Sequence, residues 1–404
     1  MIQVAVLGYG TVGSGVVEVI EKNKKLVNKK AGAELNVKYI LDLREFPGDP
    51  YEHKVIHDFE VIANDPEVQI VCEVMGGVGA AYAFTKRALE AGKSVCSSNK
   101  ELVAAHGPEL LALAKANHCN YLFEASVGGG IPIIRPLNDA LTAERIEAIT
   151  GILNGTTNYI LTKMENEGAD FDSVLKKAQE LGYAERNPEA DVEGYDACRK
   201  IAILSSLMLG KHVNYEKIYT EGITRITSSD FVFAKKLGMS IKLLAMSKEV
   251  GEGKAVAMVA PCLISAQHPL RMVNDVFNAV FVKGNMLGDA MFYGKGAGKL
   301  PTASAVVADV IDCARHMGTT NLCFWEAENA ELVSVEETSR RFFVRLKDQG
   351  EAEARALFGD LEAVRSEDAE GQFAFLTPVL TEKEFAEKYA QLGESALGRI
   401  RVED

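Results

Sequence analysis

A glycine-rich turn near the N-terminus constrains the fold of this chain more than any other feature. The apolar run at residues 2–7 leads directly into Gly8, Gly10 and Gly13, and a helical pattern follows from residue 14. Gly8 permits the tight bend, Gly10 lets a pyrophosphate approach the backbone, and Gly13 allows close packing of helix on strand. Free N–H groups at the helix start attract phosphate charge. The pattern predicts a dinucleotide-binding α/β domain; the alternative is a glycine turn in an unrelated α/β protein.

Short apolar runs alternate with helical patterns through the first third of the chain. We expect strands at residues 35–41, 70–73, 94–96 and 121–124, with a helix from residue 80. Such alternation is typical of a parallel sheet with crossover helices. We therefore predict a Rossmann-type domain over residues 1–134.

The rest of the chain predicts two further units. Residues 135–295 have β patterns at 146–153 and 255–263 and helical patterns at 172–181 and 196–209, as expected for an α+β domain. A glycine-dense turn and a small-residue helix at 296–318 return the chain to the first domain. Residues 338–404 follow the order strand, helix, strands, helix, strand, which favours a small ferredoxin-like module. The expected fold class is α/β with these three units.

Charge and apolar patterning exclude several classes of partner. The formal net charge of −13 disfavours nucleic acid and anionic lipid, because both would repel such a surface. The longest apolar stretch, residues 201–209, is far shorter than the ~20 residues of a membrane helix. No basic segment precedes the apolar N-terminus, as it would in a secretory signal. We therefore expect a cytoplasmic protein. Its cysteines and histidines lack the spacing of a redox or zinc motif.

The second expected strand ends in residues that favour different cofactors. Asp42 can accept a hydrogen bond from the 2′-hydroxyl of an adenosine ribose, which favours NAD, whereas Arg44 can pair with a 2′-phosphate, which favours NADP. Both are equally explained as solvated residues at a strand end. The sequence leaves the cofactor open.

Two lysines have positions suited to catalysis. Lys100 follows the expected strand at 94–96, at the carboxyl edge where open α/β sheets bind ligands. Lys200 follows Asp196 by one helical turn and adjoins an apolar run, so its ammonium group is expected to be partly desolvated. The plainer interpretations are a surface lysine and an ordinary ion pair, which stabilises a helix by only about 0.2–0.5 kcal/mol.

Two loops contain groups suited to ligands. Residues 154–158 (NGTTN) stand between a strand and a helix, where hydroxyl and N–H groups can hold a carboxylate, or where one residue simply caps the helix. Glu124 precedes the glycine loop at 127–131, and carbonyl oxygens beside a carboxylate are ligands for a hard cation.

Six motifs occur in one order along the chain: GYGTVG, SSNKELV, EASVGGGIP, GILNGTTNYIL, GYAERNPEADVEGYDACRKIAIL and GKGAGKLPTASAVVADV. In this order the chain resembles the homoserine dehydrogenases, from its first residue to about Gly318. The resemblance implies reversible interconversion of L-homoserine and L-aspartate 4-semialdehyde with NAD(P), a step toward threonine, isoleucine and methionine.

The resemblance also implies roles for particular residues. Lys100 and Lys200 would flank the reacting carbon and handle the proton, because hydride transfer at a carbinol carbon must be matched by proton transfer at its oxygen. The residues implied in amino-acid binding are Glu185, Asp191, Asp196, Gly155, Thr156 and Tyr183. Those implied in cofactor binding are Gly8, Tyr9, Gly10, Thr11, Val12, Gly13, Asp42, Arg44, Ser98, Lys100 and Gly298. A monovalent cation, Na⁺ or K⁺, would be held by Glu124, Val127, Gly129 and Ile131.

Further implications concern assembly and regulation. The resemblance implies a homodimer, and the tail resembles an ACT module in its element order, which makes inhibition by threonine a hypothesis. Many relatives carry arginine where Leu41 stands, so the choice between NAD and NADP stays open. Two alternative functions are another amino-acid dehydrogenase, which substrate profiling would separate, and a nucleotide-sensing regulator without catalysis, which would not need the two lysines and Asp196.

Overall fold

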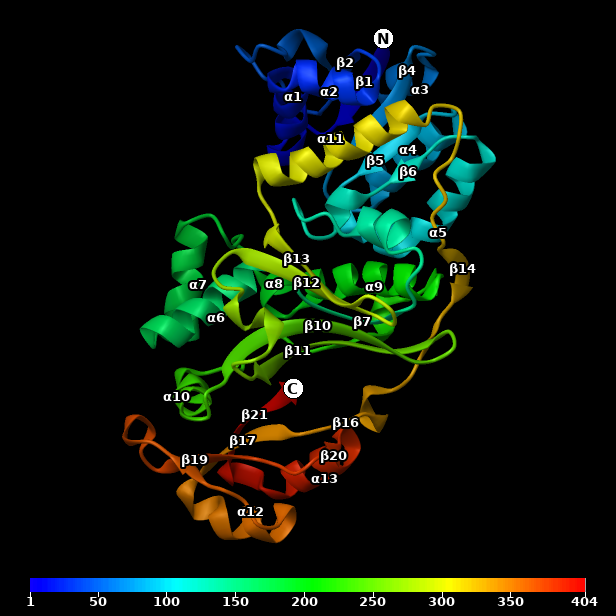
Figure 1. Ribbon diagram of the computed structural model, residues 1–404. Coiled ribbons are helices and arrows are strands. Elements are labelled where there is room, and N and C mark those ends of the chain that lie inside the picture. Colours follow the sequence, from blue (N-terminus) through cyan, green and yellow to red (C-terminus); the bar gives the residue numbers. More distant parts are fainter. Residues whose placement is uncertain (404) are drawn as a thin grey trace.

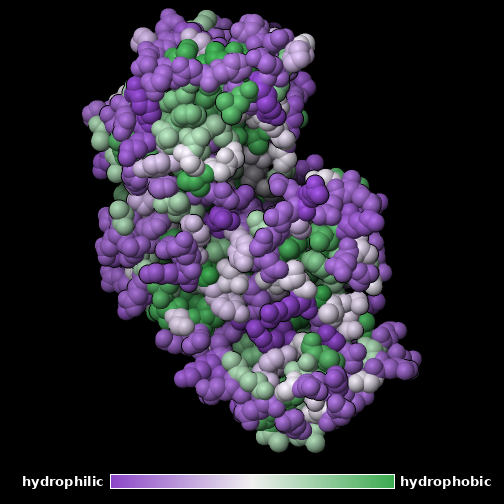
Figure 2. Space-filling view, turned by 180° about the vertical axis from the view of Figure 1, so that it is seen from behind, coloured by the Kyte–Doolittle hydropathy of each residue, from purple (hydrophilic) through white to green (hydrophobic). Residues whose placement is uncertain are grey.

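The computed structural model describes residues 1–403 and arranges them in three parts that follow one another along the molecule (Figure 1). The N-terminal sheet lies at one end, a second sheet lies in the middle, and the C-terminal segment lies at the other end. Hydrophilic residues cover most of the rear face, where hydrophobic residues form scattered patches (Figure 2). Among the described residues, no helix has the length and apolar character needed to cross a membrane.

The N-terminal part is a six-stranded parallel sheet in the order β3-β2-β1-β4-β5-β6. Its strands are β1 (Ile2–Leu7), β2 (Leu35–Leu41), β3 (Val55–Ile56), β4 (Val68–Glu73), β5 (Ser94–Ser97) and β6 (Tyr121–Leu122). Its helices are α1 (Thr11–Lys22), α2 (Lys24–Ala31), α3 (Phe59–Asn64), α4 (Gly79–Glu90) and α5 (Lys100–Ala116). This strand order is that of dinucleotide-binding sheets. The predicted parallel α/β sheet is thereby confirmed.

Two element boundaries differ from the sequence prediction. The first helix begins at Thr11 rather than at residue 14, because Gly10 is already its N-cap. A Cβ atom on Gly13 would lie only 1.8 Å from the carbonyl oxygen of Gly8, so the turn is tighter than the helical pattern indicated. The strand predicted at 121–124 ends at Leu122, because the N–H of Glu124 donates to Asp309 of a distant helix instead of a neighbouring strand.

That distant helix, α11 (Lys299–Arg315), returns the chain to the N-terminal sheet and packs along α1. A Cβ atom on Gly15 of α1 would lie 2.9 Å from Cβ of Ala303, so the close contact requires glycine at this position.

The second sheet is antiparallel in its core, with the order β13-β12-β7-β10-β11. Its strands are β7 (Ile146–Ile152), β10 (Ser240–Gly251), β11 (Lys254–Ile264), β12 (Phe277–Gly284) and β13 (Gly288–Lys295). The helices of this part are α6 (Gly155–Glu167), α7 (Phe171–Glu180), α8 (Glu189–Val192), α9 (Tyr195–Leu209) and α10 (Ser228–Lys236). Helices α6 and α9 pack against β10 on the side that faces the N-terminal sheet.

The C-terminal segment continues this sheet. Its elements are β17 (Phe342–Lys347), α12 (Glu351–Phe358), β18 (Val364–Arg365), β19 (Gln372–Leu376), α13 (Glu382–Gln391) and β21 (Ala396–Glu403), with strand order β21-β17-β19-β18. Strand β21 pairs in parallel with β11, so the two sheets become one. The remaining strands are only two or four residues long. They are β8 (Lys211–His212), β9 (Tyr219–Thr220), β14 (Glu326–Asn329), β15 (Glu331–Leu332), β16 (Ser339–Arg340) and β20 (Leu380–Thr381). The assignment of this segment as ACT-like stays a prediction.

Candidate active site

A cleft of about 690 Å³ lies where the N-terminal sheet meets the second sheet. Lys100 reaches it from the first turn of α5, just beyond the carboxyl end of β5, while Asp196 and Lys200 reach it from α9. The edge of a parallel sheet is where such folds bind ligands. The folded chain therefore brings the two lysines of the sequence prediction into one cleft.

One carboxylate joins the two lysines. Nζ of Lys100 lies 3.0 Å from Oδ1 of Asp196, and Nζ of Lys200 lies 2.6 Å from Oδ2 of the same residue. Lys200 also donates to the carbonyl oxygen of Leu153 at 2.8 Å. The Asp196 side chain is 7% exposed, whereas the Lys100 side chain is 37% exposed. Lys200 is thus fixed within the wall, and Lys100 extends into the cleft.

The charges of this group depend on one another. Burial alone would raise the pKa of Asp196, but the ammonium groups of Lys200 and Lys100 outweigh it and hold that pKa well below its usual range. The negative charge of Asp196 in turn raises the pKa of Lys100, against the opposing effect of burial. Burial and the nearby charge of Asp196 raise the pKa of Asp191, a second carboxyl in the cleft. Asp196 therefore stays ionised and keeps Lys100 charged at neutral pH.

Asn154 organises the acidic side of the cleft. Its Oδ1 accepts the N–H of Thr157 and so caps α6, as one of the two sequence interpretations proposed. Its Nδ2 donates to Asp191 at 2.7 Å and to Asp196 at 2.9 Å. Sequence reasoning missed this second role, because the three residues are brought together only by the packing of α6, α8 and α9.

The remaining predicted residues of this site also line the cleft. They are Gly155, Thr156, Tyr183, Glu185, Asp191, Ser98, Gly129 and Gly298. Thr156 is held in place by a 2.6 Å hydrogen bond from its hydroxyl to the carbonyl oxygen of Tyr183. Sequence reasoning missed Val276, Lys295 and Thr302, which line the same cleft from the strands and loops of the second sheet and from α11.

A second cavity, of about 520 Å³, opens beside the glycine turn and is lined by Gly8, Gly10, Asp42 and Arg44 among others. Asp42 accepts a hydrogen bond from the N–H of Tyr9 at 2.7 Å. It also accepts a bidentate pair of hydrogen bonds from the Arg44 guanidinium, each of 2.9 Å. The Tyr9 ring packs against Phe46, and Tyr9 is not among the residues that line the cavity. Thr11, Val12 and Gly13 form the first turn of α1, whose N–H groups suit a pyrophosphate. The residues present therefore fit a dinucleotide.

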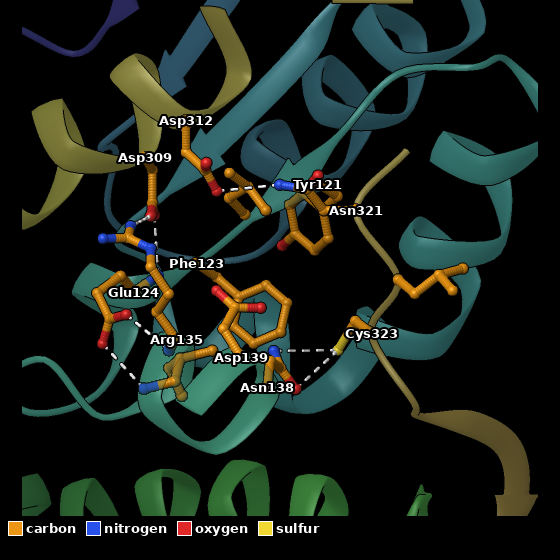
Figure 3. Close-up of a pocket in the computed structure, with 13 residues that line it drawn as sticks. Tyr121, Phe123, Glu124, Arg135, Asn138, Asp139, Asp309, Asp312, Asn321 and Cys323 are labelled. Atoms are coloured by element: carbon orange, nitrogen blue, oxygen red, sulfur yellow. Dashed lines mark hydrogen bonds and ion pairs between the residues drawn. The ribbon is translucent and has the colours of Figure 1, made fainter. Parts of the chain in front are cut away.

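The residues predicted to hold a cation lie at the loop between β6 and β7. Both carboxylate oxygens of Glu124 accept backbone N–H groups, at 2.6 Å from Ile133, 2.9 Å from Ile134 and 2.8 Å from Arg135. Figure 3 shows Glu124 together with Arg135 at this turn. The Arg135 side chain extends from this turn to Asp309 of α11. Glu124 therefore fixes the turn, a role that sequence reasoning did not anticipate.

The carbonyl groups of this loop provide the test of fit for a cation. Within residues 1–403, no hydrogen bond reaches the carbonyl oxygens of Val127, Gly129 or Ile131, although all three residues are buried. Buried carbonyl groups nearly always have a partner. Carbonyl oxygens without a partner, and a carboxylate of the same loop with acceptor capacity left, are the types of ligand that fit a hard cation.

Two family profiles match the chain. The profile described as homoserine dehydrogenase matches residues 132–311, and the profile described as the NAD-binding domain of homoserine dehydrogenase matches residues 8–124. Homoserine dehydrogenases from Bacillus subtilis and Synechocystis are 43% and 45% identical over 320 residues, which cover 78% and 77% of this chain and 73% of each relative. The homoserine dehydrogenase of Helicobacter pylori is 38% identical over 369 residues, 91% of this chain and 86% of the relative.

Solved structures agree with the sequence relatives. A homoserine dehydrogenase from Thiobacillus denitrificans superposes with a TM-score of 0.91 at 36% identity, covering 100% of this chain and 98% of that one. A hyperthermophilic archaeal homoserine dehydrogenase in complex with NADPH gives a TM-score of 0.64 at 29% identity, covering 77% of this chain and 97% of that one. The sequence resemblance is confirmed, and the chain belongs to the homoserine dehydrogenase family.

Proposed function

We propose that this chain catalyses reversible, NAD(P)-dependent hydride transfer between L-homoserine and L-aspartate 4-semialdehyde. The observation that carries the proposal is the group Lys100–Asp196–Lys200, in which two ammonium groups share one buried carboxylate inside the cleft. Charge develops on the substrate oxygen during hydride transfer, and fixed positive charges beside that oxygen lower the barrier. Family membership supplies the identity of the substrate.

In this proposal the two lysines have different roles, one in charge stabilisation and the other in proton transfer. The nicotinamide, when bound, accepts or donates the hydride. Lys100 stays charged because Asp196 raises its pKa, so it stabilises negative charge on the substrate oxygen. Lys200 moves the proton, since its ammonium group is fixed by Leu153 and Asp196 with one N–H left for the substrate oxygen. In the oxidative direction Lys200 accepts the hydroxyl proton in its neutral form.

The cleft has groups for both charged ends of the amino acid. The carboxylates of Glu185 and Asp191 line it and suit the substrate ammonium group. The first turn of α6 provides backbone N–H groups at Gly155 and Thr156, which suit the substrate carboxylate. Placing both ends leaves the side-chain oxygen of the substrate toward the lysines.

The direct test is the change in reduced-nicotinamide absorbance with L-homoserine and either NAD or NADP. We expect turnover that depends on L-homoserine and is absent with L-aspartate or L-lysine as control substrates. No turnover with either cofactor would contradict the proposal.

Finer features belong to the same proposal. The free carbonyl groups at Val127, Gly129 and Ile131 support a bound Na⁺ or K⁺, which would hold the loop beside the cleft. Rates in sodium, potassium and choline chloride at equal ionic strength test it, and equal rates in all three would contradict it. A homodimer, a cytoplasmic location and an effect of threonine rest on the family resemblance; sedimentation and calorimetric titration of the full chain with L-threonine test the first and the last.

A further inference from the structure

Asn278 of β12 is a buried polar side chain to which the mechanism gives no role. It is 1% exposed, and among the described residues neither its Oδ1 nor its Nδ2 atom has a hydrogen-bond partner. Burying an amide without a partner costs free energy, and the large majority of buried polar side chains have one. A carboxamide with both ends unsatisfied therefore points to a second state in which a partner is present.

The carboxamide lies directly against Gly296, in the loop that joins β13 to α11. A Cβ atom on Gly296 would lie 2.0 Å from Nδ2 and 2.7 Å from Oδ1 of Asn278, so only glycine fits there. Gly296 is also close to Gly129, because a Cβ atom on Gly129 would lie 2.4 Å from the carbonyl oxygen of Gly296. Gly129 and Gly296 both line the catalytic cleft, as does Gly155, whose Cβ would lie 3.6 Å from Oδ1 of Asn278. Asn278 thus lies immediately behind the cleft wall.

The neighbouring loop is the natural source of the missing partners. This loop, residues 295–298, holds Gly296 against the carboxamide, and it links the second sheet to α11 of the N-terminal part. Gly298 has a φ of 123°, a conformation that other residues rarely adopt. A ligand that fills the cleft contacts this same loop, because Gly296, Ala297 and Gly298 line the cleft.

We propose that Asn278 is a positioning residue that fixes the loop at 295–298 once cofactor and amino acid fill the cleft. In the loaded enzyme Nδ2 donates to a loop carbonyl oxygen and Oδ1 accepts a loop N–H. The unsatisfied carboxamide disfavours the free state, and its satisfaction favours the loaded state, so the difference adds to ligand affinity. The inference rests on the proposed function, since it uses the ligands of that reaction.

The test compares Asn278→Leu with Asn158→Leu by thermal unfolding without ligand, with NAD or NADP alone, and with L-homoserine added. Asn158 of α6 is the control, because it is equally buried and its Oδ1 also lacks a partner among the described residues, but its Nδ2 donates to the carbonyl oxygens of Val273 and Phe277, so only one end of its carboxamide is unsatisfied. We expect Asn278→Leu to keep or raise the unfolding midpoint of the free enzyme and to lose most of the ligand-induced rise. Its KM values should increase on the order of tenfold. Asn158→Leu should lower the midpoint of the free enzyme and retain the ligand-induced rise.

The opposite result would overturn the inference. If Asn278→Leu lowers the free midpoint and keeps the full ligand-induced rise, as expected for Asn158→Leu, then Asn278 has only a structural role. Asn278→Ala, which removes the carboxamide without added bulk, gives the same comparison if the leucine variant does not fold. If NAD or NADP raises the unfolding midpoint of the wild-type protein but L-homoserine is not oxidised, the proposed function is contradicted. The role of Asn278 is then tested by the cofactor-induced rise in midpoint alone, compared between wild type and Asn278→Leu.

Discussion

The second sheet has two neighbours, and its two junctions are built differently. Toward the N-terminal sheet, the junction is the cleft, lined by glycine loops and by the charges of Lys100, Asp196 and Lys200. Toward the C-terminal segment, β21 pairs with β11, and Arg345 of β17 reaches Asp230 of α10. We call these the cleft junction and the tail junction.

The difference between them lies in what the charged groups contact. At the tail junction the Arg345 guanidinium also donates to Thr227 and Gln372, so its donors are used within the protein. At the cleft junction Lys100 remains 37% exposed. Charges available to a ligand serve chemistry, whereas charges already satisfied serve the attachment of one part to another. Substitutions at the two junctions should therefore separate activity from stability.

The largest expected effect is on turnover at the cleft junction. Lys200→Ala should lower kcat for homoserine oxidation by roughly two to four orders of magnitude, because it removes the proposed proton-transfer group. The unfolding midpoint of the variant should stay within a few degrees of the wild type, since Asp196 keeps Lys100 as a partner. Initial rates and thermal unfolding measure both, with Lys176→Ala, on the exposed side of α7, as the control. Retained turnover would remove Lys200 from the mechanism.

The tail junction should show the reverse pattern. Arg345→Ala leaves Asp230 buried without its partner, and breaking a buried ion pair in this way costs about 3–5 kcal/mol. Denaturant unfolding should report that loss, while kcat at low temperature stays unchanged. Arg355→Ala, at an exposed ion pair with Glu351 in the same segment, should cost less than about 1 kcal/mol. A large fall in kcat for Arg345→Ala would show that the two junctions are coupled.

A smaller effect is expected at Glu73, a buried carboxyl group that, unlike Asp230, has no arginine paired with it within residues 1–403. Burial raises the pKa of Glu73, at the end of β4, to about 7, against the opposing hydrogen bonds from Ser97 and Met75. Because this pKa exceeds that of the unfolded chain, the contribution of Glu73 to stability is complete below about pH 4.5 and is lost as the pH rises through 7. From pH 4.5 to 8, Glu73→Gln should gain roughly 1–3 kcal/mol in unfolding free energy relative to wild type. Equal pH profiles for the two proteins, with Glu60→Gln as the exposed control, would contradict this assignment.

The sequence predicts the N-terminal sheet better than the second sheet. Strands β1 and β2 occur at the predicted residues, because buried parallel strands are apolar runs that end at residues such as Gly8 and Asp42. Strands β10, β12 and β13 were missed. In β13 half-buried and exposed residues alternate at the edge of the sheet, and this leaves a weak apolar signal. The pairing of β11 with β21 joins segments more than 130 residues apart, and no local pattern predicts it.

The candidate site was also predictable only in part. Their positions made Lys100, Asp196 and Lys200 candidates, but a surface lysine and an ordinary ion pair explained the same residues, and only the resemblance to the homoserine dehydrogenases implied their roles. The bridge from Asn154 to two aspartates and the unsatisfied carboxamide of Asn278 depend on packing between distant segments. Neither could be predicted without the fold.

The smallest expected effect compares two arginine–aspartate pairs that differ in burial. Arg44 is 62% exposed and contacts Asp42 at 2.9 Å in the nucleotide cavity, whereas Arg345 is 6% exposed in its contact with Asp230. Asp42 is 9% exposed but also accepts the backbone N–H groups of Tyr9 and Arg44, so the exposed Arg44 guanidinium can leave it and meet a 2′-phosphate while the carboxylate keeps partners. With NAD, which has no 2′-phosphate, we expect Asp42 to accept from the ribose 2′-hydroxyl. We therefore propose that this one pair serves both cofactors.

Arg44→Ala should therefore lower kcat/KM for NADP by about tenfold, as expected for the loss of one charged hydrogen bond to phosphate, and change kcat/KM for NAD by less than about threefold. Asp42→Ala should do the opposite, because it removes the ribose acceptor and a repulsive charge together. Arg87→Ala, an exposed arginine of α4 paired with Glu60, is the matched control and should alter neither ratio. If Arg44→Ala lowers both efficiencies equally, the guanidinium does not distinguish a phosphate from a hydroxyl, and the contrast between an exchangeable and a fixed ion pair fails at this site.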